Sequence, residues 1–188
     1  MSASRAKRGA TAALVLLLIT VGGGCGFDVE MARPDCGSEE LSTLLVIAQS
    51  VHDARLVPCL ETIPAGWTFT RLDARDNRST IELASDRGGD HALEVTLLPT
   101  CDTAGAVRIP SDEQLTRRFE RVDRLAPHYE GTRYYLFDGG CVTYRFKLDS
   151  PRPSGLLNEA TVMVGFVTRA ELRAALAEAT NGVIENGP

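Results

Sequence analysis

Short runs in which apolar and polar residues alternate dominate the middle of the chain. Such alternation predicts β-strands that bury one face and leave the other in contact with water. Runs of this kind occupy residues 67–72, 80–84, 92–98, 133–137 and 141–148, and a further apolar run at 161–167 predicts a last strand. Turn-forming residues at Asp86–Asp90 and Asp138–Gly140 join two pairs of these runs, which predicts two β-hairpins.

Helical spacing of apolar residues appears on both sides of these strands. The segment 38–53 predicts an N-terminal helix, because its leucines recur at the spacing of one helix face. Ser111–Gln114 has the form of a capping box and predicts a middle helix through about Asp123, and Thr168–Glu171 predicts the start of a C-terminal helix in the same way. The fold class predicted is α+β: an antiparallel sheet of about five to six strands packed with N-terminal, middle and C-terminal helices.

The N-terminus has the pattern of an export signal. Three basic residues, Arg5, Lys7 and Arg8, precede an uncharged apolar run of 12 residues, Ala10–Val21. A helix that crosses a membrane needs about 20 such residues, whereas a run of about this length is typical of the apolar region of a signal peptide. The run therefore predicts export.

Small residues followed directly by a cysteine, Gly22-Gly23-Gly24-Cys25, end this run and resemble the lipobox of bacterial lipoproteins. The resemblance implies that Cys25 carries a lipid and becomes the new N-terminus, at the outer face of the cytoplasmic membrane. It departs from the family pattern at Gly22, where an aliphatic residue is usual. Cleavage to a secreted protein and retention as an uncleaved anchor stay open as alternatives.

These observations divide the chain into a signal peptide at 1–24, a lipidated tether at 25–35 and a single domain at 36–188. Among its 188 residues, 44% are hydrophobic and 24% are charged, which excludes disordered, collagenous and multi-span membrane proteins. Removing the three basic residues of the signal lowers the formal net charge from −5 to −8. An acidic domain argues against a nucleic-acid partner, because binding to phosphates needs concentrated positive charge.

Four cysteines remain once Cys25 is assigned to lipid, and an exported chain favours disulfides between them. Spacing alone allows three pairings. Cys36 and Cys59 flank the first predicted helix, and Cys101 and Cys141 border predicted strands, so the pairs Cys36–Cys59 and Cys101–Cys141 are favoured. The CxxC spacing of redox and metal sites is absent from the sequence.

Two groups of side chains are candidates for a binding surface. Arg117, Arg121 and Arg124 would form a basic stripe on the predicted middle helix, which could face anionic headgroups or an acidic partner, or simply lie in solvent. The aromatic side chains of the second hairpin could line a pocket for a small apolar ligand or form the core. These are Tyr135, Phe137, Tyr144 and Phe146.

No recognised catalytic, metal or cofactor motif occurs in the sequence. The histidines, His52, His91 and His128, do not have metal-ligand spacing, and the GxSxG and P-loop patterns are absent. No catalytic residue, metal or cofactor is therefore assigned. The sequence favours a cell-envelope lipoprotein that acts as a binding or accessory module for another envelope protein or a small apolar ligand. The alternative is a cell-envelope hydrolase with an unrecognised active site.

Overall fold

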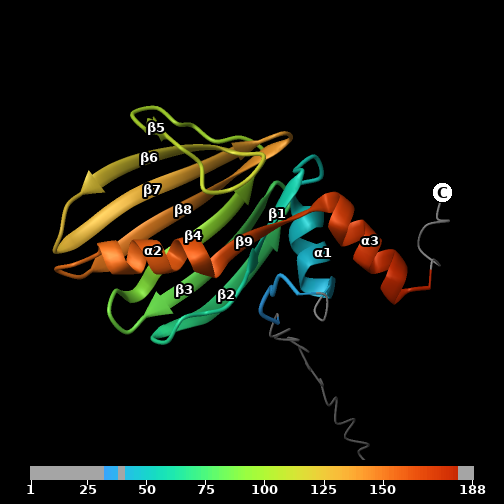
Figure 1. Cartoon of the computed structure of the whole chain (residues 1–188), viewed down its shortest axis with the longest axis horizontal. Coiled ribbons are helices and arrows are strands. Elements are labelled where there is room, and N and C mark those ends of the chain that lie inside the picture. The colour runs from blue at the N-terminus through green and yellow to red at the C-terminus, as the bar shows by residue number, and fades with distance from the viewer. Residues whose placement is uncertain (1–31, 38–40, 182–188) are drawn as a thin grey trace, which may run out of the picture. The chain divides into compact units, whose positions relative to one another are not determined.

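The computed structural model describes residues 32–37 and 41–181. The chain divides into two units, 1–30 and 31–188, and everything described below belongs to the second. The predicted signal peptide and the predicted lipid attachment at Cys25 lie outside the described residues. The described part contains three helices and nine strands (Figure 1).

The helices are α1 (Leu41–Ser50), α2 (Ser154–Met163) and α3 (Arg169–Ala179). The strands are β1 (Leu56–Leu60), β2 (Trp67–Arg75), β3 (Arg78–Ser85), β4 (Gly89–Leu98), β5 (Val107–Ile109), β6 (Arg117–Arg124), β7 (His128–Phe137), β8 (Gly140–Asp149) and β9 (Val164–Thr168).

Seven strands form one antiparallel sheet in the order β2-β3-β4-β8-β7-β6-β5. It consists of two meanders, β2–β4 and β5–β8, joined where β4 pairs with β8. The remaining strands, β1 and β9, pair with each other as a separate two-stranded sheet. The predicted α+β class and the two hairpins are confirmed, and the main sheet has more strands than the five to six expected.

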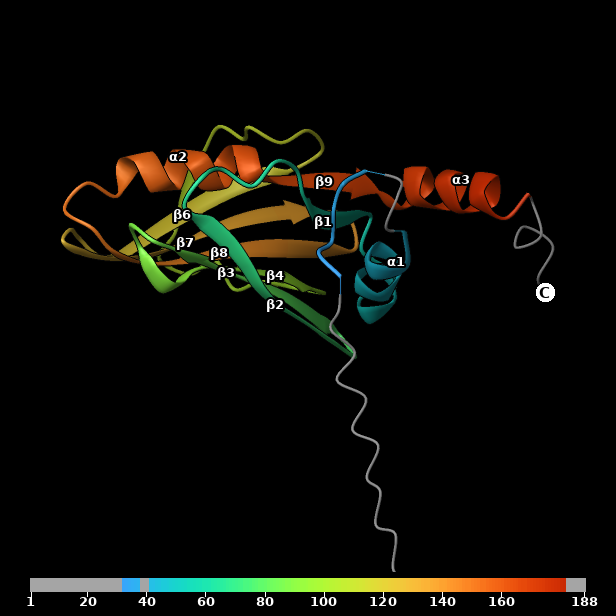
Figure 2. The same cartoon turned by 90° about the horizontal axis from the view of Figure 1, so that it is seen from below.

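One face of the seven-stranded sheet, here named the covered face, packs under α2 and β9 (Figure 2). Its central side chains are fully buried, and each fully buried aliphatic or aromatic residue contributes about 1.5–3 kcal/mol to stability. They include Ile81, Leu83, Val95, Leu97, Val142, Tyr144 and Phe146. The opposite face, here named the open face, carries the charged side chains of the same strands, as the alternation in the sequence predicts.

The predicted middle helix at 111–123 is wrong. The Ser111 hydroxyl does accept a hydrogen bond from the Glu113 N–H at 3.2 Å, as an N-cap would. The chain then takes a left-handed conformation at Leu115, with φ of 61°, which ends the turn before a helix can propagate. Residues 117–124 instead form β6, because they pair along their length with β7.

The last predicted strand, 161–167, is correct only in its second half. Residues 161–163 belong to α2, where the Thr161 hydroxyl donates to the Leu157 carbonyl oxygen at 3.1 Å. From Val164 onward the chain extends as β9 and pairs with β1. The predicted C-terminal helix is confirmed as α3, and it begins with a complete capping box between Thr168 and Glu171.

Candidate functional site

A row of charged side chains crosses the open face of the sheet from strand to strand. The register pairs Arg71 on β2 with Glu82 on β3, Glu82 with Glu94 on β4, and Glu94 with Arg145 on β8. Directly paired residues project to the same face of a sheet, and neighbouring strands lie about 4.8 Å apart. This charge row (Arg71, Glu82, Glu94 and Arg145) therefore reads positive, negative, negative, positive.

The opposite charges of the charge row do not neutralise one another. Among the described residues, no ion pair joins Arg71 to Glu82 or Glu94 to Arg145, although each pair is in register. Arg71 instead approaches Asp73 at 3.5 Å. Within the described part of the chain, the side chains of Glu82 and Arg145 have no hydrogen-bond or ion-pair partner.

A hollow of about 340 Å³ lies over the charge row. Its lining consists of Arg71, Glu82, His91, Leu93, Glu94, Arg145 and Lys147. A volume of this size falls in the range of small-molecule sites, but most such sites are apolar, whereas this one is lined by five charged side chains. The hollow is therefore suited to a ligand that carries charges of its own.

A smaller hollow of about 180 Å³ adjoins the first across β2 and β3 and shares Arg71 and Glu82 with it. Its charged side chains form ion pairs with one another, since Asp73 lies 2.9 Å from the Arg75 guanidinium and 3.5 Å from that of Arg71. The larger hollow contains the charged side chains that have no ion-pair partner among the described residues, Glu82, Arg145 and Lys147, and it is the stronger candidate site.

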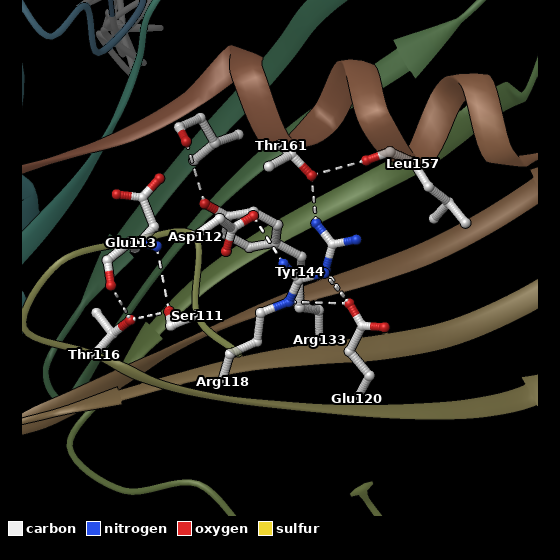
Figure 3. Close-up of polar contacts among 11 residues, drawn as sticks. Ser111, Asp112, Glu113, Thr116, Arg118, Glu120, Arg133, Tyr144, Leu157 and Thr161 are labelled. Carbon is white, nitrogen blue, oxygen red and sulfur yellow. Dashed lines mark hydrogen bonds and ion pairs between the residues drawn. The ribbon is translucent and has the colours of Figure 1, made fainter. Parts of the chain in front are cut away.

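The covered face holds a second polar cluster, in which the charged side chains pair with one another (Figure 3). Arg118 and Arg133 both bind the Glu120 carboxylate, Arg133 at 2.5 Å. Arg118 also binds Asp112 at 2.8 Å, and Arg133 donates to the Thr161 hydroxyl of α2 at 2.6 Å. Every charge in this group faces a partner, so the cluster fastens α2 and the 111–116 segment to the sheet.

Burial changes the titration of groups beside this cluster. Burial, and secondarily the nearby Asp112 carboxylate, raise the pKa of Glu113 above its ordinary value. Burial likewise raises the pKa values of Tyr135 and Tyr144, so both phenols are neutral at physiological pH. Neither tyrosine has the lowered pKa expected of a nucleophile or a general base.

The predicted pocket aromatics lie on the covered face. Tyr135, Tyr144 and Phe146 are at most 2% exposed, and the Tyr135 and Tyr144 rings are 4.9 Å apart. Phe137 is partly exposed and packs against Phe166 of β9, with ring centroids 6.4 Å apart. This packing favours the core interpretation over the ligand pocket.

The predicted basic stripe lies on a strand instead of a helix. Arg117 and Arg121 share the open face of β6, and a register shift after Val122 brings Arg124 to the same face. Arg121 and Arg124 each pair with a carboxylate of β6 or β7, at 2.8 Å and 3.2 Å. Two of the three charges are thus neutralised locally, and a role toward headgroups or an acidic partner stays a prediction.

The four domain cysteines form the two favoured pairs. Cys36 is bonded to Cys59 with the Cα atoms 4.9 Å apart, because the 34–36 segment lies alongside β1. Cys101 is bonded to Cys141 with the Cα atoms 6.1 Å apart. The prediction of two disulfides is confirmed.

The histidines do not assemble a hydrolytic site in the described part of the chain. His128 Nδ1 lies 2.7 Å from the Asp149 carboxylate, but no serine, threonine or cysteine of the described residues is hydrogen-bonded to its other ring nitrogen. His91 lines the hollow on the open face. The hydrolase alternative stays a prediction.

The charge row cannot be recognised as a site from the sequence pattern. Alternation places Glu82 and Arg145 on a wet face, but it does not reveal that β4 pairs with β8 and thereby brings Glu94 opposite Arg145. The sequence pattern does not contain the long-range strand pairing that brings these residues together.

Within residues 32–37 and 41–181, no group of three or more metal-ligating side chains converges. None of the helices described is both long and apolar enough to cross a membrane. Comparison of the chain with protein-family models, with curated proteins and with solved structures finds no match.

Proposed function

We propose that the protein is a lipid-anchored binding module of the bacterial cell envelope, and that it binds a small charged ligand in the hollow on the open face. The anchor rests on the resemblance of Gly22–Cys25 to a lipobox. The binding role rests on the free charges around a hollow of about 340 Å³. A rigid sheet suits this role, because the side chains it presents are held at fixed spacing.

A polar ligand fits this site better than an apolar one. The aromatic side chains Tyr135, Tyr144 and Phe146 are packed into the core, whereas the side chains lining the hollow are mostly charged. A second candidate partner is another envelope protein, which would bind to the same face of the sheet. In both cases the lipid would place the domain at the outer face of the cytoplasmic membrane.

Labelling with a radioactive fatty acid in a bacterial host tests the anchor. The wild-type chain is expected to take up label and fractionate with the membrane, and Cys25→Ser is expected to lose both properties. Cys36→Ala is the matched control, because it removes a cysteine that the structure places in a disulfide. An unlabelled wild-type chain would contradict the lipoprotein proposal.

Amide chemical shifts of the full-length Cys25→Ser chain test the binding role. The panel consists of small anions, amines and zwitterions, with a neutral sugar as the control compound. Charged compounds are expected to perturb amides of β3, β4 and β8 at millimolar concentration or below, and the sugar is not. If no charged compound perturbs these amides, the hollow is not a ligand site.

A further inference from the structure

The order of the charges around the hollow indicates which class of ligand the hollow suits. Glu82 and Glu94 face each other across β3 and β4 at the centre of the charge row. Arg71 lies on the outer side of this pair, and Arg145 and Lys147 on β8 lie on the other. A ligand seated in the hollow thus meets two carboxylates next to two cations.

The two carboxylates create a place for a positive group. Like charges directly opposite each other in a sheet are destabilising, so Glu82 and Glu94 repel unless a cation lies between them. The nearest guanidinium, that of Arg78, approaches Glu94 only to 3.8 Å, and Thr96 donates to Glu94 at 3.4 Å. An ammonium ion of a ligand would bind both carboxylates at once.

Arg145 and Lys147 create a place for a negative group beside it. They are two residues apart on one strand, so they project to the same face and lie about 6.6 Å apart along it. Glu94 is in register with Arg145 and Glu130 with Lys147, but among the described residues these carboxylates form their ion pairs with Arg78 and Arg124 instead. The planar fork of the Arg145 guanidinium matches a carboxylate in a two-bond arrangement, and Lys147 adds a second point charge.

The centre of the carboxylate pair lies between β3 and β4, so it is about one and a half strand spacings, or about 7 Å, from the cations on β8. An extended residue spans at most about 3.3–3.6 Å, so the free ends of a dipeptide are up to about 7 Å apart. A dipeptide can therefore reach from the carboxylate pair to the cation pair, allowing for the reach of the side chains. A simple anion would meet the two carboxylates, and a simple cation would leave Arg145 and Lys147 without a partner.

We infer that the hollow takes a zwitterion, a short peptide with a free ammonium held by Glu82 and Glu94 and a free carboxylate held by Arg145 and Lys147. This inference rests on the proposed function, since it names the ligand class of the same hollow. It adds an orientation: the amino end lies over β3 and β4, and the carboxyl end lies over β8.

Titration of the full-length Cys25→Ser chain with three alanine dipeptides tests the inference. The probes are alanyl-alanine with free ends, its N-acetyl derivative and its C-terminal amide, and the readout is the dissociation constant from amide shifts. Blocking either end is expected to weaken binding at least about tenfold, because each end loses a charge-assisted interaction.

Charge-removing variants assign each end of the peptide. The double variant Glu82→Gln/Glu94→Gln is expected to become insensitive to N-acetylation while it still distinguishes the amide. Arg145→Gln/Lys147→Gln is expected to show the reverse. Arg173→Gln is the matched control, because Arg173 is an exposed residue of α3 that does not line the hollow, and this variant is expected to bind all three probes as the wild type does.

The outcomes separate this inference from the proposed function. Equal binding of free and blocked dipeptides would overturn the zwitterion, as would the failure of the variants to exchange their sensitivities. Binding of a simple anion or amine with no binding of alanyl-alanine would overturn the zwitterion and leave the binding role intact. No binding by any charged compound would overturn both.

Discussion

At the scale of single residues, Arg133 shows how the fold accommodates a charge in its interior. It is 6% exposed, it stacks on the Phe146 ring with 5.5 Å between the guanidinium carbon and the ring centroid, and it binds Glu120 and Thr161. A buried charge is tolerated only when it is paired and hydrogen-bonded. Arg133 therefore links strand β7, strand β6 and helix α2 through one side chain.

Replacing this guanidinium should destabilise the domain strongly. Arg133→Ala leaves Glu120 with one arginine fewer and empties space against Phe146, so we expect a loss of about 3 kcal/mol in the free energy of unfolding. Chemical denaturation measures this loss.

The control is Arg117→Ala, because Arg117 lies on the exposed side of β6 and has no ion-pair partner among the described residues. Its change should stay within about 0.5 kcal/mol. Equal effects of the two substitutions would show that the interior position of Arg133 does not contribute to the free energy of unfolding.

At the scale of elements, α2 is attached to the sheet through Glu159 as well as through Thr161. The Glu159 carboxylate accepts the indole N–H of Trp67 at 2.6 Å and two bonds from the Arg87 guanidinium at 2.9 and 2.7 Å. These hydrogen bonds, first that from Arg87 and then that from Trp67, lower the pKa of Glu159. Since Trp67 is the only tryptophan of the chain, its fluorescence reports on the docking of α2.

The lowered pKa predicts how this contact responds to acid. A carboxylate whose pKa is lower in the folded state stabilises the fold above its unfolded pKa, near 4.5, and that contribution is lost as the pH falls through the folded value. We expect the Trp67 emission of the wild type to change below about pH 4.5. Glu159→Gln has no charge to titrate and should remove this transition.

Glu178→Gln is the control, since Glu178 lies on α3 away from Trp67 and should leave the acid transition as it is in the wild type. A transition that persists unchanged in Glu159→Gln would assign it to another group.

The elements that sequence predicts correctly are those whose signals are local. The hairpins β3–β4 and β7–β8 follow from alternation plus a turn, and the start of α3 follows from the Thr168 capping box. Strand β1 lacks alternation because all five of its residues are buried, and β6 is too polar to resemble a strand without its partner β7. The charge row depends on the same long-range pairing, so its members are predictable as exposed residues and not as a site.

At the scale of the whole molecule, the two disulfides cross-link separate parts of the described domain. Cys36–Cys59 closes a loop with a sequence separation of 23 and Cys101–Cys141 one of 40. The loops do not overlap, so their contributions should add. The first ties the 34–36 segment to β1, and the second ties the segment after β4 to the start of β8.

Removing the bridge that closes the longer loop should cost slightly more stability, because loop-closure entropy grows with the logarithm of loop length. From loop-closure entropy, we expect Cys36→Ala/Cys59→Ala to lower the free energy of unfolding by about 3.4 kcal/mol and Cys101→Ala/Cys141→Ala by about 3.9 kcal/mol. Denaturation of both double variants and of the quadruple variant measures the contributions and their additivity. Free thiols detected by alkylation of the unreduced Cys25→Ser chain, which has only the four bridged cysteines, would contradict the pairing.

The pairing of β1 with β9 also affects how the chain folds during its synthesis. A ribosome delivers Leu56–Leu60 early and Val164–Thr168 near the end, and chains acquire structure from the N-terminus onward during synthesis. For most of that time β1 is an apolar strand without its partner, and such an unpaired strand readily joins a neighbouring chain. Nascent copies of this protein should thus depend on chaperones until their last strand has emerged.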